Sequence, residues 1–391
     1  MKVTMIAREY PPNVYGGAGV HLRELSRCLS KLMDVEVRYF GDVNSESPHL
    51  MVKGYMPWKD LDCKLHPKFN SIFKTLATNL EMLCEGIDSQ IVHTHTWYGH
   101  FAGYLAKILY AVPFVATCHS LEPFRPWKVH QLGRGYEVST WMEKTGIEGA
   151  DKVIAVSKIM KEDILKYFNI RADRVEVVHN GIDLDTWKQK EMDPKLKKRY
   201  GIEDEYILFI GRPTAQKGMR FLIDAMDYIP CQLVMGAVGA DTKEYEDLMM
   251  AKVQKNKKIV WIHEHLKEEE YIQLYTSARV FVCPSTYEPF GIINLEAMSC
   301  KTPVVASAVG GILEVVLHEK TGLLVEPANP RKIADAVNRL LKDHGMARTL
   351  GENGRRRVEE LFSWDLIADQ TKKLYEKLVW GADAMLKKQH I

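Results

Sequence analysis

The chain has 391 residues, 46% of them hydrophobic and 27% charged, which fits a globular protein with two or three domains. The 53 Lys and Arg nearly balance the 51 Asp and Glu, so the net charge of +2 gives no bulk attraction to nucleic acid or to an anionic membrane. The seven cysteines include no Cys-x-x-Cys pair, and no apolar run approaches the ~18 residues that cross a bilayer. Without a signal-peptide core or structural zinc, a cytoplasmic location is expected.

Short apolar runs, separated by helix-spaced segments, predict buried parallel strands in both halves of the chain. Those of the first half are Val3–Ile6, Val35–Phe40, Ile91–His95, Phe114–Cys118, Val153–Val156 and Val175–Val178. After a polar segment from Asp183 to Gly201, a second series follows at Ile207–Ile210, Leu233–Met235, Ile259–Trp261, Val280–Val282 and Val304–Ala306. This alternation predicts two doubly wound α/β domains, residues 1–184 and 185–363. The helix-spaced segment 364–391 either closes the second domain or crosses back onto the first.

Four polar or glycine-rich loops follow predicted strands, which is where open α/β sheets bind ligands. They are Glu9–Gly19, His119–Arg134, Gly211–Gly218 and Pro284–Gly291. Because two come from each half, a cleft between the domains is the expected site.

The first loop places Gly16, Gly17 and Gly19 before a predicted helix, where backbone amides can cradle a phosphate. The same pattern also suggests a dinucleotide fingerprint, but its third glycine is missing. Asp42, after the second strand, is the only other hint of a dinucleotide.

The second loop begins with His119, directly after a strand, where a histidine is well placed to bind substrate. Arg125, Lys128 and Arg134 form a cationic cluster that suits an acceptor phosphate, and Trp127 offers a face for stacking a sugar. For Arg134 a solvated surface position is the simpler explanation.

The third loop carries two cations, Arg212 and Lys217, between a strand and a helix. It is not a Walker loop, because Gly218 stands where a Ser or Thr would bind magnesium. A guanidinium and an ammonium at a strand end suit a diphosphate that is handled without a metal.

The fourth loop places Glu288 and Glu296 eight residues apart, with Gly291 between them at a predicted helix start. Free amides of the first turn would face a phosphate, while the carboxylates would accept hydrogen bonds from sugar and ribose hydroxyls. A solvated loop Glu and a helix Glu paired with some Lys explain the segment about equally well. A glycosidase acid–base pair is a third interpretation, less consistent with the helix geometry.

Two further patterns suggest metal ligands. His93 and His95 point to one side of a strand, but the pattern shows no third ligand and indicates a structural role. Asp183-x-Asp185 lies in a turn before the linker. No metal site is therefore expected.

Taken together, the loops resemble those of the GT-B retaining glycosyltransferases of the family 4 type, in particular the actinobacterial-type glycogen synthase group, which includes maltose-1-phosphate synthases. The shared stretches are Arg8–Pro12, Val14–His21, His93–Tyr98, His119–Lys128, Gln131–Gly133, His179–Asp183 and Glu288–Glu296.

The resemblance implies a GT-B fold, with two Rossmann-like domains facing across a cleft and a C-terminal helix, residues 364–391, that returns to the N-terminal domain. It also implies metal-independent, retaining transfer of glucose from ADP-glucose in α-glucan synthesis. The implied catalytic residues are His119, Arg212, Lys217 and Glu288. The donor would be held by Gly17, Arg212, Lys217, Glu288, Gly291, Ile292, Ile293 and Glu296. The acceptor would be held by Trp97, Glu122, Arg125, Trp127, Lys128 and Asn180.

The acceptor itself is left open between glucose-1-phosphate and an α-glucan. Thr96 stands where classical bacterial glycogen synthases have an Asp, and the first loop lacks their Lys-Thr before Gly-Gly. The cluster of Arg125 and Lys128 favours glucose-1-phosphate. Alternatives are a UDP- or GDP-sugar donor, an NAD-dependent oxidoreductase and a non-catalytic sugar-binding protein. The oligomeric state is also open, with a homodimer as one alternative.

Overall fold

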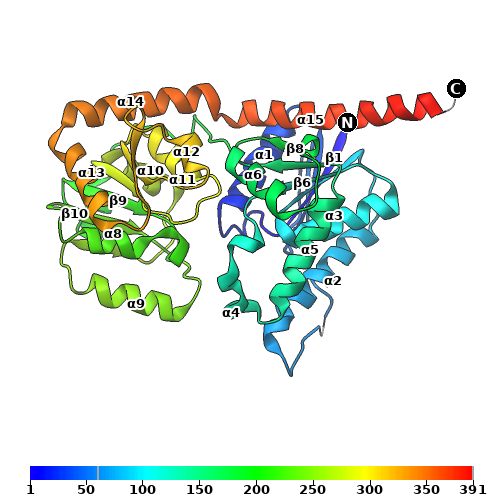
Figure 1. Ribbon diagram of the computed structural model, residues 1–391, viewed down its shortest axis with the longest axis horizontal. Coiled ribbons are helices and arrows are strands. Elements are labelled where there is room, and N and C mark those ends of the chain that lie inside the picture. Colours follow the sequence, from blue (N-terminus) through cyan, green and yellow to red (C-terminus); the bar gives the residue numbers. More distant parts are fainter. Residues whose placement is uncertain (60, 390–391) are drawn as a thin grey trace. The chain divides into compact units, whose positions relative to one another are not determined.

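The computed structural model describes residues 1–59 and 61–389, which form two compact units (Figure 1). Unit 1 comprises Met1–Asn180 together with the chain from Trp364 onward, and unit 2 comprises Gly181–Ser363. None of the described helices combines the length and the apolar character needed to cross a bilayer.

Unit 1 contains one sheet of strands in the order β3-β4-β2-β1-β5-β6-β7-β8. All neighbours pair in parallel except β3 and β4. The strands are β1 (Lys2–Ala7), β2 (Asp34–Phe40), β3 (Ser45–Ser47), β4 (Leu50–Tyr55), β5 (Ile91–His95), β6 (Phe114–Cys118), β7 (Lys152–Ala155) and β8 (Val175–Val177). The central strands β1, β5 and β6 are buried on both faces, which explains their mostly apolar sequences. β5 is the exception, because it ends in the buried polar residues His93, Thr94 and His95.

Helices cover both faces of this sheet. They are α1 (Gly17–Leu29), α2 (Asn70–Cys84), α3 (Thr96–Tyr110), α4 (Val129–Leu132), α5 (Gly135–Gly149), α6 (Lys158–Tyr167) and α15 (Trp364–Gln389), with short 3₁₀ turns η1 (Pro67–Phe69), η2 (Glu122–Phe124), η3 (Pro126–Lys128) and η4 (Ala172–Arg174). One core joins β1 and β2 to α1 and α15, and another joins the opposite face of the sheet to α2 and α3. Ser157 caps α6 by accepting a hydrogen bond from the Met160 amide.

Unit 2 contains an all-parallel sheet in the order β11-β10-β9-β12-β13-β14. Its strands are β9 (Tyr206–Ile210), β10 (Gln232–Gly236), β11 (Ile259–Ile262), β12 (Val280–Cys283), β13 (Val304–Ser307) and β14 (Gly322–Val325). Its helices are α7 (Pro194–Tyr200), α8 (Met219–Ala225), α9 (Lys243–Val253), α10 (Glu268–Ser277), α11 (Ile292–Ser299), α12 (Ile312–Val315), α13 (Pro330–Lys342) and α14 (His344–Leu361), with the 3₁₀ turn η5 (Ala215–Lys217). Counted along the chain, this is the 3-2-1-4-5-6 order of doubly wound nucleotide-binding folds. The prediction of parallel α/β sheets is confirmed.

Each sheet reverses its strand order once, between β1 and β5 in unit 1 and between β9 and β12 in unit 2. Such a reversal opens a crevice at the carboxyl ends of the two strands, where doubly wound folds bind ligands. In unit 2 the loops that leave β9 and β12 are Gly211–Gly218 and Pro284–Gly291. In unit 1 the corresponding positions carry Arg8 and Thr96. The fold thus brings both predicted loops of unit 2, and the predicted loop Glu9–Gly19 after β1, to these two crevices. The fourth predicted loop, His119–Arg134, follows β6, the strand next to β5.

Candidate functional site

Lys217 and Glu288 form a buried ion pair at the crevice of unit 2. The ammonium Nζ of Lys217 lies 2.6 Å from Oε2 of Glu288, and the Ser285 hydroxyl donates to the same oxygen at 3.2 Å. Burial alone lowers the pKa of Lys217, but the negative charge of Glu288 and the hydrogen bond to it outweigh burial, so the pKa is raised. Lys217 therefore remains a cation at neutral pH, held in place by its carboxylate partner.

Arg212 supplies a second, more accessible cation just after β9. Its side chain is 39% exposed, and Nη1 lies 3.3 Å from Oδ1 of Asp241. Because the guanidinium is this exposed, it keeps N–H donors available for an entering phosphate. The two predicted cations thus lie on one loop at the strand end.

A glycine allows the two loops of unit 2 to lie against each other. Gly218 has φ +66°, and a Cβ there would lie 1.9 Å from the carbonyl oxygen of Pro284. The Thr286 amide also donates to the Gln216 carbonyl at 2.8 Å. This approach requires glycine at position 218, because any side chain would push the two loops apart.

Helix α11 begins next to Glu288. Gly291, with φ +93°, is its N-cap, so Ile292 and Ile293 provide the first amides of the helix, which have no partner within it. Glu296 is half-buried one turn later and accepts a hydrogen bond from the Tyr275 hydroxyl at 2.9 Å. Glu288 is thus buried and ion-paired rather than solvated, and these groups offer amides and carboxylates within one short stretch.

Three histidines converge at the crevice of unit 1. His21 lies in α1, His95 ends β5, and His119 follows β6; one ring nitrogen of each lies within 4.8 Å of the other two. Nδ1 of His95 and Nε2 of His119 are 3.1 Å apart, and Nδ1 of His21 lies 2.7 Å from Oδ1 of Asn180. The sequence pattern showed no third ligand beside His95, and the fold supplies two.

Burial keeps these imidazoles neutral at physiological pH. It lowers the pKa of His21 to about 4, although the bond to Asn180 opposes the shift. It also lowers the pKa of His95 and His119 well below the usual range, with a further contribution from neighbouring histidines. His93 has a structural role, as predicted, because its nitrogens bond to the hydroxyls of Tyr375 and Thr117.

Lys128 is buried rather than available as a surface cation. Its Nζ lies 2.7 Å from Oε1 of Glu122, whose side chain is fully buried and also accepts from the Ser139 hydroxyl. Burial lowers the pKa of Lys128, although the charge of Glu122 opposes the shift. The Glu122 amide donates to Glu143, whose pKa is raised well above its usual range by burial and by the charge of Glu122. Lys128 is therefore already neutralised by Glu122.

The remaining acceptor-side candidates differ in accessibility. Trp97 is 2% exposed and stacks on Tyr98, whereas Trp127 is half-buried. Nε of Arg125 is buried and has no hydrogen-bond partner among the described residues, while its Nη1 lies 3.4 Å from the Ser120 hydroxyl and 3.8 Å from Oε1 of Glu122. Arg125 and Lys128 thus share the single carboxylate of Glu122, which leaves one positive charge in this group of three side chains.

Sequence reasoning did not select Arg8 and Glu9 as site residues. The Arg8 guanidinium lies 4.2 Å from the centre of the Tyr98 ring, and the Glu9 carboxylate accepts from the amides of Tyr15 and Gly16 at 2.9 and 3.0 Å. Burial raises the pKa of Tyr98, and the charges of Arg8 and Arg125 both act on it in the opposite direction. Arg8 is thus placed over the Tyr98 ring by a direct contact. Arg8 could have been found from its position directly after a strand.

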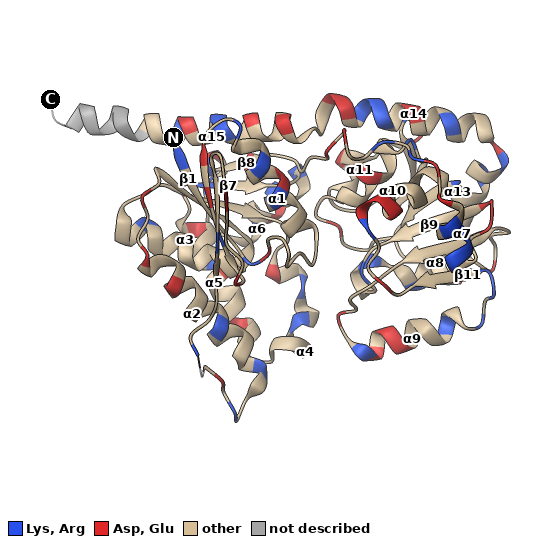
Figure 2. Cartoon of the chain, turned by 180° about the vertical axis from the view of Figure 1, so that it is seen from behind, with Lys and Arg blue, Asp and Glu red and all other residues tan. Residues whose placement is uncertain are grey.

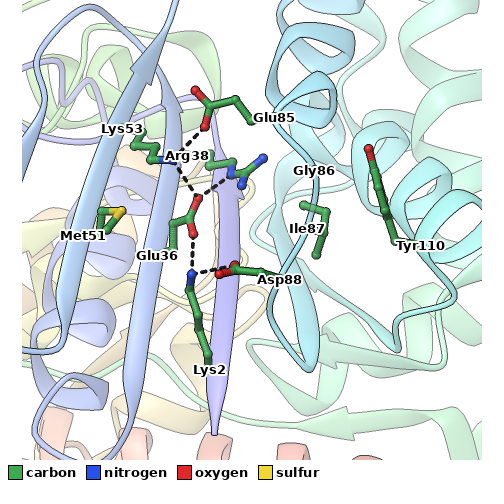
Figure 3. A pocket seen from close by; sticks show the side chains of 10 residues that line it. All are labelled: Lys2, Glu36, Arg38, Met51, Lys53, Glu85, Gly86, Ile87, Asp88 and Tyr110. Carbon is green, nitrogen blue, oxygen red and sulfur yellow. Dashed lines mark hydrogen bonds and ion pairs between the residues drawn. The ribbon is translucent and has the colours of Figure 1, made fainter.

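A hollow of about 450 Å³ lies elsewhere in unit 1, near the start of β1 and the residues that precede β5 (Figure 3). Lys2 and Arg38 bond to opposite oxygens of Glu36 at 2.9 and 2.7 Å, and Lys53 bonds to Glu85 at 2.7 Å (Figure 3). Burial alone would raise the pKa of Glu36, but the bonds to Lys2 and Arg38 lower it. The charges here compensate one another, so this hollow is a structural ion network.

Charge elsewhere is mixed rather than segregated. Figure 2 shows acidic and basic positions interspersed along α9 and α14, in keeping with the net charge of +2. The Asp183 carboxylate accepts from the amides of Asp185 and Thr186, which confirms the turn expected there.

Comparison with known proteins identifies the family. Residues 15–186 match the model of Glycosyltransferase Family 4, and residues 192–357 match that of Glycosyl transferases group 1. The chain is 43% identical to the α-maltose-1-phosphate synthase of Mycolicibacterium smegmatis, covering 97% of this chain and all of that protein. It is 27% identical to a glycogen synthase of Mycobacterium tuberculosis, over 96% of this chain and 94% of the other.

Among solved structures, a sucrose-phosphate synthase from Thermosynechococcus elongatus is similar, with a TM-score of 0.82 and 26% identity over 97% of this chain and 99% of the other. The chain thus belongs to the family 4, group 1 glycosyltransferases and has their GT-B fold.

Proposed function

We propose that the protein transfers glucose from ADP-glucose to glucose-1-phosphate with retention of the α configuration, which makes maltose 1-phosphate. The observation that carries this proposal is the 43% identity to α-maltose-1-phosphate synthase along 97% of the chain. In the reaction, the bond between glucose C1 and the diphosphate breaks. An acceptor hydroxyl oxygen bonds to C1, and the hydroxyl proton is released.

The donor half of the proposal rests on the cations of unit 2. Arg212 would bind the diphosphate bidentately, and Lys217 would act as a fixed point charge beside it. As the C1–O bond breaks, negative charge grows on the leaving ADP, so cations already in place stabilise the transition state more than the ground state. These side chains would replace a metal ion in that role.

Other groups would hold the rest of the donor. Amides of Gly291, Ile292 and Ile293 at the start of α11 suit a phosphate or sugar oxygen, and Gly17 offers the same kind of donor at the start of α1. Glu288 would orient Lys217 and accept from glucose hydroxyls. Glu296, oriented by Tyr275, would accept from the ribose hydroxyls.

The acceptor half would lie in unit 1. Arg8, which lies over the Tyr98 ring, and Arg125, on the loop after β6, are the cations proposed to bind the phosphate of glucose-1-phosphate. Lys128, paired with Glu122, would shape the loop rather than touch the phosphate. His119 is proposed to contact the transferred glucose.

Three further residues would complete the acceptor site. Trp127 is proposed as the stacking face for the acceptor sugar. Trp97 packs behind Tyr98, and Asn180 orients His21 through its hydrogen bond.

A direct test pairs ADP-, UDP- and GDP-glucose with glucose-1-phosphate, maltose and glycogen and identifies each product. The proposal predicts that ADP-glucose with glucose-1-phosphate is the fastest pair and yields an α-linked disaccharide phosphate. A faster reaction with another nucleotide would overturn the donor, and a β-linked product would overturn retention.

An α-glucan acceptor is the second candidate, because Lys128 is neutralised by Glu122 and the expected cluster is smaller than the sequence implied. Faster transfer to maltose or glycogen than to glucose-1-phosphate would favour this candidate.

A further inference from the structure

The three converging imidazoles of unit 1 have the spacing of a metal site. Nδ1 of His95 and Nε2 of His119 are 3.1 Å apart, close to the roughly 3.4 Å that separates two nitrogens on a tetrahedral zinc with bonds of about 2.0–2.1 Å. The ring centre of His21 lies 4.6 Å from that of His119 and 5.3 Å from that of His95. The three rings come from α1, β5 and the loop after β6, so elements of the sheet core hold them.

Two ring nitrogens in this cluster lack partners. Nε2 of His21 and Nε2 of His95 are buried and have no hydrogen-bond partner within the described part of the chain. In His95, Nε2 can carry the ring proton, which leaves the lone pair of Nδ1 to bind an ion beside Nε2 of His119. Nδ1 of His21 donates to the amide oxygen of Asn180, which leaves the lone pair on Nε2. Metal-binding histidines are oriented by this kind of outer hydrogen bond.

His93 provides the contrast within the same strand. Both of its nitrogens already bond to hydroxyls, so it has no lone pair to offer. The three remaining histidines present neutral imidazole, the form that binds Zn²⁺, Co²⁺ and Ni²⁺.

We propose that His21, His95 and His119 bind one divalent transition-metal ion of the Zn²⁺ class, and that this ion inhibits glucosyl transfer. Three protein nitrogens leave a fourth position for water. The inhibition rests on the proposed function, because His119 is one of the groups assigned to the sugar. A metal on His119 removes its nitrogen from that contact, so sugar and metal compete.

Metal binding is tested without turnover by titrating the full-length, metal-free protein with Co²⁺. Three imidazoles around Co²⁺ produce visible d–d absorption, without the thiolate charge-transfer band that binding at a cysteine would give. We expect one Co²⁺ per chain, displaced by one Zn²⁺. Absence of that band at stoichiometric Co²⁺ would overturn the site.

Variants locate the ion. His119→Gln and His21→Gln should weaken Co²⁺ binding by more than 100-fold, and Asn180→Ala by about 10- to 100-fold through the lost outer hydrogen bond. His130→Gln, an exposed histidine of the same unit, should bind as the wild type does. His119 is only partly buried, so its variant carries the test if His21→Gln fails to fold. Unchanged binding in His119→Gln would contradict the proposal.

The inhibition is tested separately. Zn²⁺ at the concentration that displaces Co²⁺ should reduce transfer by the wild type at least 10-fold, and ADP-glucose, whose glucose is assigned to His119, should raise the Zn²⁺ concentration needed. If the wild-type protein binds the metal and still transfers glucose at the full rate, the inhibition is disproved but the metal site is not. A chain that binds the metal and transfers to no acceptor would disprove the proposed function alone.

Discussion

Lys217 and Glu288 neutralise each other inside unit 2, with side chains only 17% and 8% exposed. Removing one partner of such a pair leaves the other charge buried without compensation, whereas removing both leaves none. Stability and catalysis should therefore respond differently to single and double substitution.

Lys217→Met should lower the free energy of unfolding of unit 2 by about 3 kcal/mol, and Lys217→Met with Glu288→Gln should recover most of it. Both variants should lose kcat by about 10²–10³-fold, because the cation beside the leaving group is gone. Urea unfolding and transfer assays measure the two effects. Lys243→Met, at an exposed surface pair with Asp247, is the control. An active double variant would contradict the assigned role.

Arg8 and Arg125 should distinguish the phosphorylated acceptor from a glycan. Replacing either with Ala should raise KM for glucose-1-phosphate at least 10-fold, because a charge-assisted bond to the phosphate is lost, and should spare transfer to maltose. Arg134→Ala is the matched control, because that side chain is 85% exposed in the same loop region. Equal loss with both acceptors would refute the phosphate assignment.

His100 gives unit 1 a defined pH dependence. Burial lowers its pKa from 6.5 to about 3, so the unfolded chain binds a proton that the folded chain does not bind between these values. The neutral, buried His100 therefore contributes to the free energy of unfolding in full above pH 6.5, and this contribution is lost as the pH falls toward 3. Replacing His100 with Asn should reduce the slope of unfolding free energy against pH, between pH 6 and 4, by up to about 1.4 kcal/mol per unit. An unchanged slope in urea unfolding would show that His100 does not titrate this way.

Some residue-level features follow from sequence and others do not. Arg212 and Lys217 were predictable, because they follow an apolar strand and precede a helix. The burial of Lys128 was not predictable from the sequence. A lysine six residues from a glutamate is normally expected at the surface, and only the folded structure shows that both are buried as a pair. The role of Lys128 depends on its ion pair with Glu122, and the sequence pattern does not show which side chains the tertiary structure brings together.

At the scale of elements, one close approach holds the loops of unit 2 together. Gly218→Ala would place a Cβ 1.9 Å from the Pro284 carbonyl oxygen and should displace the loop that carries Glu288. We expect ADP binding, measured by calorimetry, to weaken at least 10-fold.

Gly201→Ala is the matched control for that substitution. Gly201 has a similar φ of +63° with nothing within 4 Å, so its variant should carry only the intrinsic strain of about 1–2 kcal/mol. Equal ADP affinity in the two variants would contradict the loop contact.

The element pattern was largely predictable because buried parallel strands are continuous apolar runs. β3, β4 and β14 were missed. β3 is the polar segment Ser45–Ser47, and β4 includes Lys53 and Gly54, which break the apolar run. β14 has an apolar run, Leu323–Val325, as long as runs that were predicted elsewhere. The convergence of His21 with His95 and His119 was also out of reach, because it depends on the strand order, which periodicity does not contain.

At the scale of the whole molecule, α15 belongs to the core of unit 1 although it is last in the chain. Trp364, Ile367, Leu374 and Tyr375 are buried in the same cluster as the α1 face of the sheet. Unit 2, by contrast, is one continuous segment with a core of its own.

A chain that ends at Ser363 should therefore lose the cooperative unfolding of unit 1 and keep ADP binding by unit 2. Ile367 and Leu374 alone contribute about 1.5–3 kcal/mol each through apolar burial. A chain that ends after Gly381 retains all four side chains and serves as the control in thermal unfolding. Two intact transitions in the shorter chain would contradict the assignment of α15 to unit 1.

A crystal structure with ADP-glucose bound would locate the donor directly. We expect the diphosphate within hydrogen-bonding distance of Arg212 and Lys217, near the first amides of α11, and the ribose against Glu296. A nucleotide bound away from these three side chains would contradict the assignment of the donor site.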